Sequence, residues 1–184
     1  MKTWLTLFIH QQNRFQKMLG HFVAWGLLSL VVLSASVVIL RYGFDAGAIA
    51  LQETVLYNHA LVFMLGMGYA LQQDKHVRVD VFYETMSPKR KAWVNLIGAL
   101  FLALPTLLFI AWASWEYVEV SWRIHETSSE PGGLPFVYLL KTVILVMAAL
   151  VSLQALTLAA ESALQLTDST PTPSETPEAS SAKL

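Results

Sequence analysis

The sequence contains no cysteine, so the chain has no disulfide framework, no thiolate nucleophile and no cysteine-based metal site. Charged residues are also scarce, at 14% of the 184 residues, and the net charge is −1. No basic face remains outside a few short loops, which argues against a nucleic-acid partner. There is no hydrolase elbow, HExxH sequence or clustered ligand set. We therefore expect neither an enzyme nor a protein that binds a metal or a cofactor.

The sequence has instead four long stretches without a charged residue. They cover residues 22–40, 54–73, 92–115 and 142–160, and they are 19 to 24 residues long. As helices they span roughly 28 to 36 Å, against about 30 Å of bilayer hydrocarbon, and they lack the polar face of a helix on a soluble core. The sequence therefore predicts an all-α membrane protein. Its domain, residues 20–161, has four transmembrane helices at about 21–41, 49–71, 92–118 and 137–160.

The remaining charges indicate how the predicted helices are oriented. Residues 72–91 hold five of the twelve Lys and Arg residues, and such residues in short loops favour the cytoplasmic side. With this loop inside, only Arg41, Arg123 and Lys141 fall on the outer side. Before the C-terminal tail, eight fall on the inner side: Lys2, Arg14, Lys17, Lys75, Arg78, Lys89, Arg90 and Lys91. Both termini are then predicted to be cytoplasmic.

The two ends of the chain differ from the apolar domain. Residues 1–19 carry Trp4, Phe8, Phe15 and Met18 at helical spacing, with polar residues between them. This pattern predicts an amphipathic arm, a helix that lies on the cytoplasmic face of the membrane. The alternative, a signal peptide cut near residues 34–36, would leave an odd number of spans. Residues 167–184 are rich in Ser, Thr, Pro and Glu, so we expect a disordered cytoplasmic tail.

The central loop and the third span carry further local signals. Valines alternate with polar residues in the loop, but a lone strand at a membrane surface would leave its backbone groups unpaired. We expect instead a short interfacial helix that includes Tyr83 and Met86. Ser87 and Pro88 predict the N-cap and first residue of the next helix. Pro105, in the middle of that helix, predicts a kink.

Glu53 is the main candidate for a functional residue within the spans. It lies about one turn inside the outer boundary of the second span, where a carboxylate is costly unless it is protonated, solvated or paired. It either has a functional role or reaches the membrane interface as a residue at the helix start. Lys141 is expected at the same depth on the fourth span, so an ion pair between Glu53 and Lys141 is a hypothesis.

The predicted outer loop, residues 116–136, is acidic and ends in SSEPGGLP. Its last part carries Pro131, Gly132, Gly133 and Pro135, which predict a defined turn rather than a helix. The two glycines do not indicate a phosphate-binding loop, because the Lys and Ser/Thr of a Walker sequence are missing.

His21 and His59 raise the alternative of a haem-binding electron carrier. His21 opens the first span at the inner face, whereas His59 lies well inside the second span. They would be about 12 to 15 Å apart along the membrane normal. One haem does not bridge that distance, and His76 and His125 lie in loops on opposite sides. We therefore expect no haem.

Several motifs together resemble the small membrane subunit, DctQ type, of the tripartite ATP-independent periplasmic (TRAP) transporters. They are Gln52-Glu53, Leu65-Gly66, HVRVDVFYETMSPKRKAWVNLIG at 76–98 and SSEPGGLPFVYLLK at 128–141. The resemblance covers roughly residues 22–160. It departs from the family at Gln52, where members more often carry a second acidic residue.

The resemblance implies a secondary transporter in three parts. These are a periplasmic solute-binding protein, a large membrane subunit with the substrate and sodium sites, and this small subunit as a scaffold in the bacterial inner membrane. It implies sodium-coupled uptake of a small, carboxylate-type organic solute, with no cofactor. The alternative is a four-span subunit of another membrane complex. Subunit-contact or structural roles are expected for Glu53, His76, Arg78, Asp80, Gly132, Gly133, Pro135 and Lys141.

Overall fold

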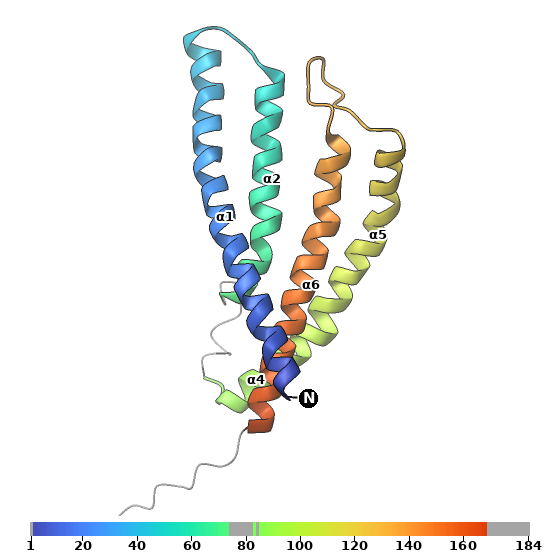
Figure 1. Cartoon of the computed structure of the whole chain (residues 1–184). Coiled ribbons are helices and arrows are strands. Elements are labelled where there is room, and N and C mark those ends of the chain that lie inside the picture. The colour runs from blue at the N-terminus through green and yellow to red at the C-terminus, as the bar shows by residue number, and fades with distance from the viewer. Residues whose placement is uncertain (1, 74–82, 84, 169–184) are drawn as a thin grey trace, which may run out of the picture.

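The fold is a bundle of long helices (Figure 1). The computed structural model describes residues 2–73, 83 and 85–168. The helices are α1 (Lys2–Gly43), α2 (Ile49–Gln72), a third helix made of α4 (Pro88–Ile97), η1 (Gly98–Ala103) and α5 (Leu104–Arg123), and α6 (Val137–Asp168). No strand occurs among the described residues. All four helices are long and apolar enough to cross a bilayer, so the predicted all-α membrane fold is confirmed.

The two ends of the bundle carry different segments (Figure 1). One end, the loop end, carries the α1–α2 connection, residues 44–48, and the α5–α6 loop, residues 124–136. The other end, the terminal end, carries the start of α1, the start of α4 and the end of α6. Both described ends of the chain therefore lie at the same end of the bundle, as an even number of spans requires.

α6 is the central helix. It packs against α1, α2, α4, η1 and α5. In its most apolar stretch 44% of the residues are buried, against 6% in each of the other three spans. Ala148, Ala155 and Ala159 of α6 are almost inaccessible, because small side chains let neighbouring helices approach closely. Most of the apolar surface of the other helices is exposed in this chain.

Glycines bring α1 and α2 close together. A Cβ on Gly20 would lie 2.5 Å from the ring of Tyr69, and one on Gly68 would lie 2.5 Å from Nε2 of Gln16. Neither position has room for a side chain. The two helices therefore pack with their backbones close, as small residues in membrane helices allow.

The N-terminal arm is continuous with the first span. α1 has 42 residues and does not break near Gly20. At 1.5 Å per residue it is about 63 Å long, roughly twice the hydrocarbon thickness. Its N-terminal half crosses α6 (Figure 1). Residues 2–19 of the predicted arm are thus the first half of a long helix that continues into the first span.

Two helices extend past their predicted ends. α5 continues to Arg123, so the α5–α6 loop is shorter than the predicted 116–136. An ion pair between Arg123 and Glu119, at 2.8 Å, joins successive turns of the extension. α6 continues to Asp168, past the predicted end at residue 160 and into the first two residues of the predicted tail. The rest of the tail lies outside the described residues.

The irregularity predicted at Pro105 takes the form of a π-helix. The N–H of Leu104 donates to the carbonyl of Ala99, five residues back. Pro105 has no N–H, so the α-helical hydrogen bond to Phe101 cannot form. The π-helical turns lie directly before it, and the third helix remains continuous.

Candidate functional site

Glu53 on α2 holds the α5–α6 loop in place. Its carboxylate accepts hydrogen bonds from the hydroxyl of Ser128 and from the backbone N–H of Leu134, the latter at 2.5 Å. Ser128 and Leu134 are themselves joined, because the Ser128 N–H donates to the Leu134 carbonyl at 3.1 Å. One carboxylate therefore binds both sides of the turn and ties it to a helix 75 residues earlier in the chain.

The SSEPGGLP segment forms a defined turn, as predicted. The N–H of Glu130 donates to Ser128 Oγ at 3.1 Å, and that of Gly133 donates to the Glu130 carbonyl at 3.0 Å. Gly132 has a φ of +80°, a conformation that costs a residue with a Cβ roughly 1–2 kcal/mol. A Cβ on Gly133 would lie 2.7 Å from Oε1 of Glu53. The turn therefore needs glycine at 132 for its conformation and at 133 for space.

Lys141 on α6 pairs with Glu126 of the loop. Its ammonium group forms an ion pair with that carboxylate and lies 3.9 Å from the ring centroid of Tyr117 on α5. The Lys141 side chain is only 13% exposed, so Glu126 compensates a charge that is largely removed from water. The hypothesis of an ion pair between Glu53 and Lys141 is therefore wrong. Both residues lie at the loop end, but the loop supplies a different partner to each.

The ion pair also affects the protonation of Glu126. The hydrogen bond from the Lys141 ammonium group stabilises the carboxylate, so the pKa of Glu126 lies below the usual value for a glutamate. Glu126 is therefore ionised at neutral pH, and the ion pair is present there. This contact is the second point at which the loop is held, after the contact with Glu53.

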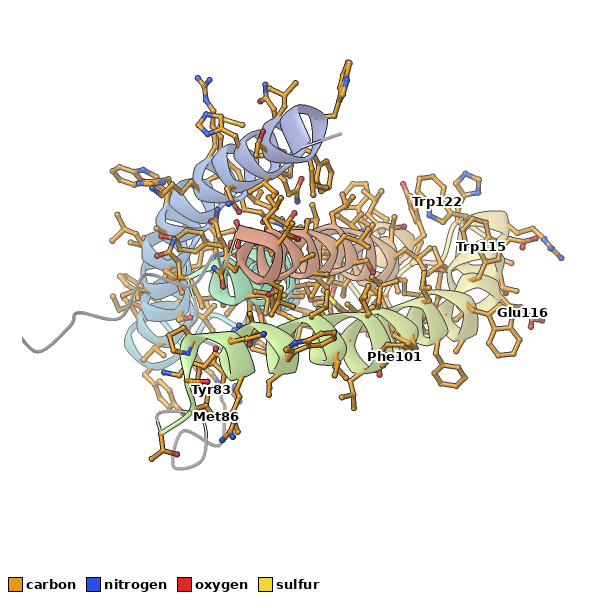
Figure 2. All side chains as sticks on the ribbon, turned by 90° about the horizontal axis from the view of Figure 1, so that it is seen from below. Tyr83, Met86, Phe101, Trp115, Glu116 and Trp122 are labelled. Carbon is orange, nitrogen blue, oxygen red and sulfur yellow. The ribbon has the colours of Figure 1, made fainter. Side chains whose placement is uncertain are left out.

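Aromatic side chains join α5 and α6 next to the loop. Trp122 Nε1 donates to Thr142 Oγ1 at 2.7 Å. The Trp122 ring meets Tyr138 edge to face, with centroids 4.8 Å apart, and His125 contacts the same tyrosine at 5.8 Å. These contacts hold the end of α5 against the start of α6. Figure 2 shows that Glu116, by contrast, projects from α5 away from α6.

The predicted site residues thus divide into two groups. Glu53, Gly132, Gly133 and Lys141 meet at the loop end, in the contacts described above. Pro135 is exposed and lies two residues before α6. Three predicted site residues lie outside the described residues: His76, Arg78 and Asp80. Most of the predicted interfacial helix also lies outside them.

A cluster of amide side chains that was not predicted from the sequence lies where α1, α2 and α6 meet. Asn13 Nδ2 donates to Glu161 Oε1 at 2.8 Å, and its backbone carbonyl accepts from Gln72 Nε2 at 2.7 Å. Its Oδ1 accepts from Gln154 Nε2 at 3.4 Å. Gln16, fully buried, donates to a backbone carbonyl of α6 at 3.2 Å. The spacing of polar residues along one face of α1 was the available signal, since amides between membrane helices find partners on neighbouring helices.

These observations define a class of protein: a membrane bundle whose polar side chains mainly hold its own helices and loop together. In the described ranges, no group of three or more His, Cys, Asp or Glu residues is placed to hold a metal ion. Residues 13–165 match the family described as tripartite ATP-independent periplasmic transporters, DctQ component. The match covers most of the chain, which therefore belongs to this family of transporter small subunits. Searches of the curated proteins and of the solved structures find no significant match.

Proposed function

We propose that this chain is a stationary scaffold within a sodium-coupled transporter. It holds the large membrane subunit in the bilayer and supports docking of a periplasmic solute-binding protein. Family membership supports the proposal, and one structural observation carries it: the α5–α6 loop is held at two points, by Glu53 of α2 and by Lys141 of α6. A loop with a constant shape is recognised without the entropic cost of ordering it.

The apolar outer faces of α1 and of the third helix are available to lipid and to the large subunit. Residues 22–40 and 92–115 contain no charge. Large side chains there are exposed: Phe22, Trp25, Leu28, Val31 and Val32 on α1, and Phe101, Phe109, Trp112 and Trp115 on the third helix. Figure 2 shows Phe101 projecting away from α6. In water such surfaces would be a liability, so they suit a bilayer and a membrane partner.

We place the loop end on the periplasmic side of a bacterial inner membrane and both termini in the cytoplasm. Described basic residues towards the terminal end are Lys2, Arg14, Lys17, Lys89, Arg90 and Lys91. At the loop end there are three, Arg41, Arg123 and Lys141, and the last two are paired with glutamates. The larger number of Lys and Arg residues at the terminal end favours the cytoplasm for that end. The docked loop then faces the compartment of a soluble binding protein.

The transported solute is a small organic carboxylate that the partner subunits recognise. Glu53, Glu126 and Lys141 are engaged in holding the loop and are not free to bind a solute. The role of this chain is therefore structural, and substrate choice and sodium coupling belong to the large subunit.

Co-expression with the large subunit, followed by reconstitution into proteoliposomes, tests the proposal. We expect the large subunit to copurify with this chain, and uptake to require the binding protein, both membrane subunits and a sodium gradient. Glu53→Gln should leave copurification intact but lower uptake and weaken docking of the binding protein. Glu119→Gln, which removes an exposed carboxylate at the same end, is the matched control. Full uptake by the large subunit alone would refute the scaffold role.

A further inference from the structure

An apolar pocket of about 370 Å³ opens near the terminal end, between α2, the start of the third helix and α6. Its walls include Leu71 of α2, Tyr83 and Met86 before α4, and Gly98 and Ala155. Figure 2 shows Tyr83 and Met86 at the start of α4. The pocket exists because glycine and alanine stand where larger side chains would fill the space. Its volume lies within the usual range for a ligand site.

The two polar side chains of the lining bind each other. Asn95 Nδ2 donates to the hydroxyl oxygen of Tyr83 at 3.0 Å. The other lining residues are apolar. The interior of the pocket therefore suits a hydrocarbon chain better than a polar solute.

Basic residues stand at the rim of the pocket, on the helix face that lines it. Arg90 precedes Val94 by one turn, and Lys91 precedes Asn95 by one turn, so each basic side chain neighbours a residue that lines the pocket. Nζ of Lys91 lies 5.1 Å from the ring centroid of Tyr83, which places the ammonium group at the rim. Neither Arg90 nor Lys91 has an ion-pair partner among the described residues.

The start of α4 adds to this positive rim. Ser87 makes no side-chain hydrogen bond to the first turn, Pro88 occupies one of the first two helical positions, and the turn contains no acidic residue. The positive end of the helix dipole therefore lies in the same turn as Arg90 and Lys91. α4 has ten residues, and the positive N-terminal end of such a helix attracts a phosphate group.

We propose that this site binds one molecule of an anionic phospholipid, with an acyl chain in the pocket and the phosphate at the start of α4 beside Arg90 and Lys91. A bilayer supplies this ligand at the required depth, because α4 begins a spanning helix and its first turn lies at the level of the headgroups. Apolar space, two basic side chains and the start of α4 meet at one rim. The acyl chain of a phospholipid matches the apolar pocket, and its anionic group matches the basic side chains and the helix start. A lipid bound there would contact α2, the third helix and α6 together.

Native mass spectrometry of the full chain in detergent tests the proposal. The chain is titrated with phosphatidylglycerol and with phosphatidylcholine of the same acyl chains. We expect one tightly bound phosphatidylglycerol, preferred by roughly tenfold. Arg90→Gln with Lys91→Gln should abolish the preference. Arg14→Gln with Lys17→Gln, which removes two positive charges from α1, should retain it.

Gly98→Leu tests the acyl-chain pocket separately. A Cβ at Gly98 would meet nothing within 4 Å, so a leucine there should occupy the pocket without disturbing the helix. We expect weaker binding of both lipids with an unchanged circular dichroism spectrum. Gly47→Leu, at another open glycine in the α1–α2 connection, is the control and should bind as the unsubstituted chain does.

Four results would overturn the proposal. They are equal affinity for the two lipids, equal loss of preference in the Arg14/Lys17 variant, unchanged binding by Gly98→Leu, and displacement of the lipid by millimolar glycerol 1-phosphate. The last would show that a phosphate group alone, rather than a lipid, occupies the site.

Discussion

Replacing Glu53 with glutamine removes the charge that accepts two hydrogen bonds from the α5–α6 loop. Hydrogen bonds to a charged group contribute about 1.5–3 kcal/mol each. Glutamine keeps one oxygen but directs its NH₂ group at the other donor, so one bond should be lost and the other should weaken. We expect loop docking to weaken by about 2–4 kcal/mol. At about 1.4 kcal/mol per factor of ten, this is roughly a 30- to 1,000-fold shift towards the undocked loop.

Hydrogen exchange of the loop amides in nanodiscs measures this shift. The Leu134 N–H donates directly to Glu53, so its exchange should accelerate at least about 30-fold, while amides inside α6 should not change. Glu119→Gln breaks only an exposed ion pair worth at most about 1 kcal/mol, so it should change loop exchange by less than about fivefold. Ser128→Ala in the Glu53→Gln background should add little, because both changes remove the same contact. Unchanged protection at Leu134 in Glu53→Gln, or equal acceleration in Glu119→Gln, would refute the docking role.

Three further predictions concern single positions. Gly133→Ala should lower the Tm, because the new Cβ would lie 2.7 Å from a carboxylate oxygen of Glu53; an unchanged Tm would contradict the tight packing. The pKa of Glu126 is lowered by Lys141, so its stabilising contribution is present above the usual glutamate pKa and is lost as pH falls through the lowered pKa. Glu126→Gln should therefore flatten the acid side of a plot of Tm against pH, and an identical plot would count against the ion pair. Gly20→Leu should lower thermal stability without loss of helix at low temperature, since even a Cβ there would lie 2.5 Å from an aromatic ring of α2; equal stability would disprove close α1–α2 packing.

The spans could be predicted because the bilayer imposes a local rule. A segment that crosses about 30 Å of hydrocarbon needs about 20 residues with few charges, and it must be helical to pair its backbone groups. The first two predicted spans accordingly end within two residues of Gly43 and Gln72. Pro88 was identified as a helix start from two residues alone, because its ring preselects the helical φ.

The same rule does not mark where a helix ends in water. α5 continues through Glu116 and Glu119 to Arg123, and α6 continues past Glu161 to Asp168. Charged residues are compatible with a helix outside the hydrocarbon, so the charge pattern shows the end of the span but not the end of the helix. For this reason the predicted outer loop was too long and the predicted fourth helix was too short.

The sequence by itself determined the number of spans, the turn at SSEPGGLP and the position of Glu53 and Lys141 near the same end of their helices, because each depends on residues that are close together in the chain. Only the tertiary structure decided which groups meet. Depth made Glu53 and Lys141 a plausible pair, but the folded loop brings Glu126 to Lys141 and leaves Glu53 to bind the loop itself. Pairing depends on the rotation of each helix about its axis and on the path of the loop, and these are set by packing between segments that are distant in the sequence.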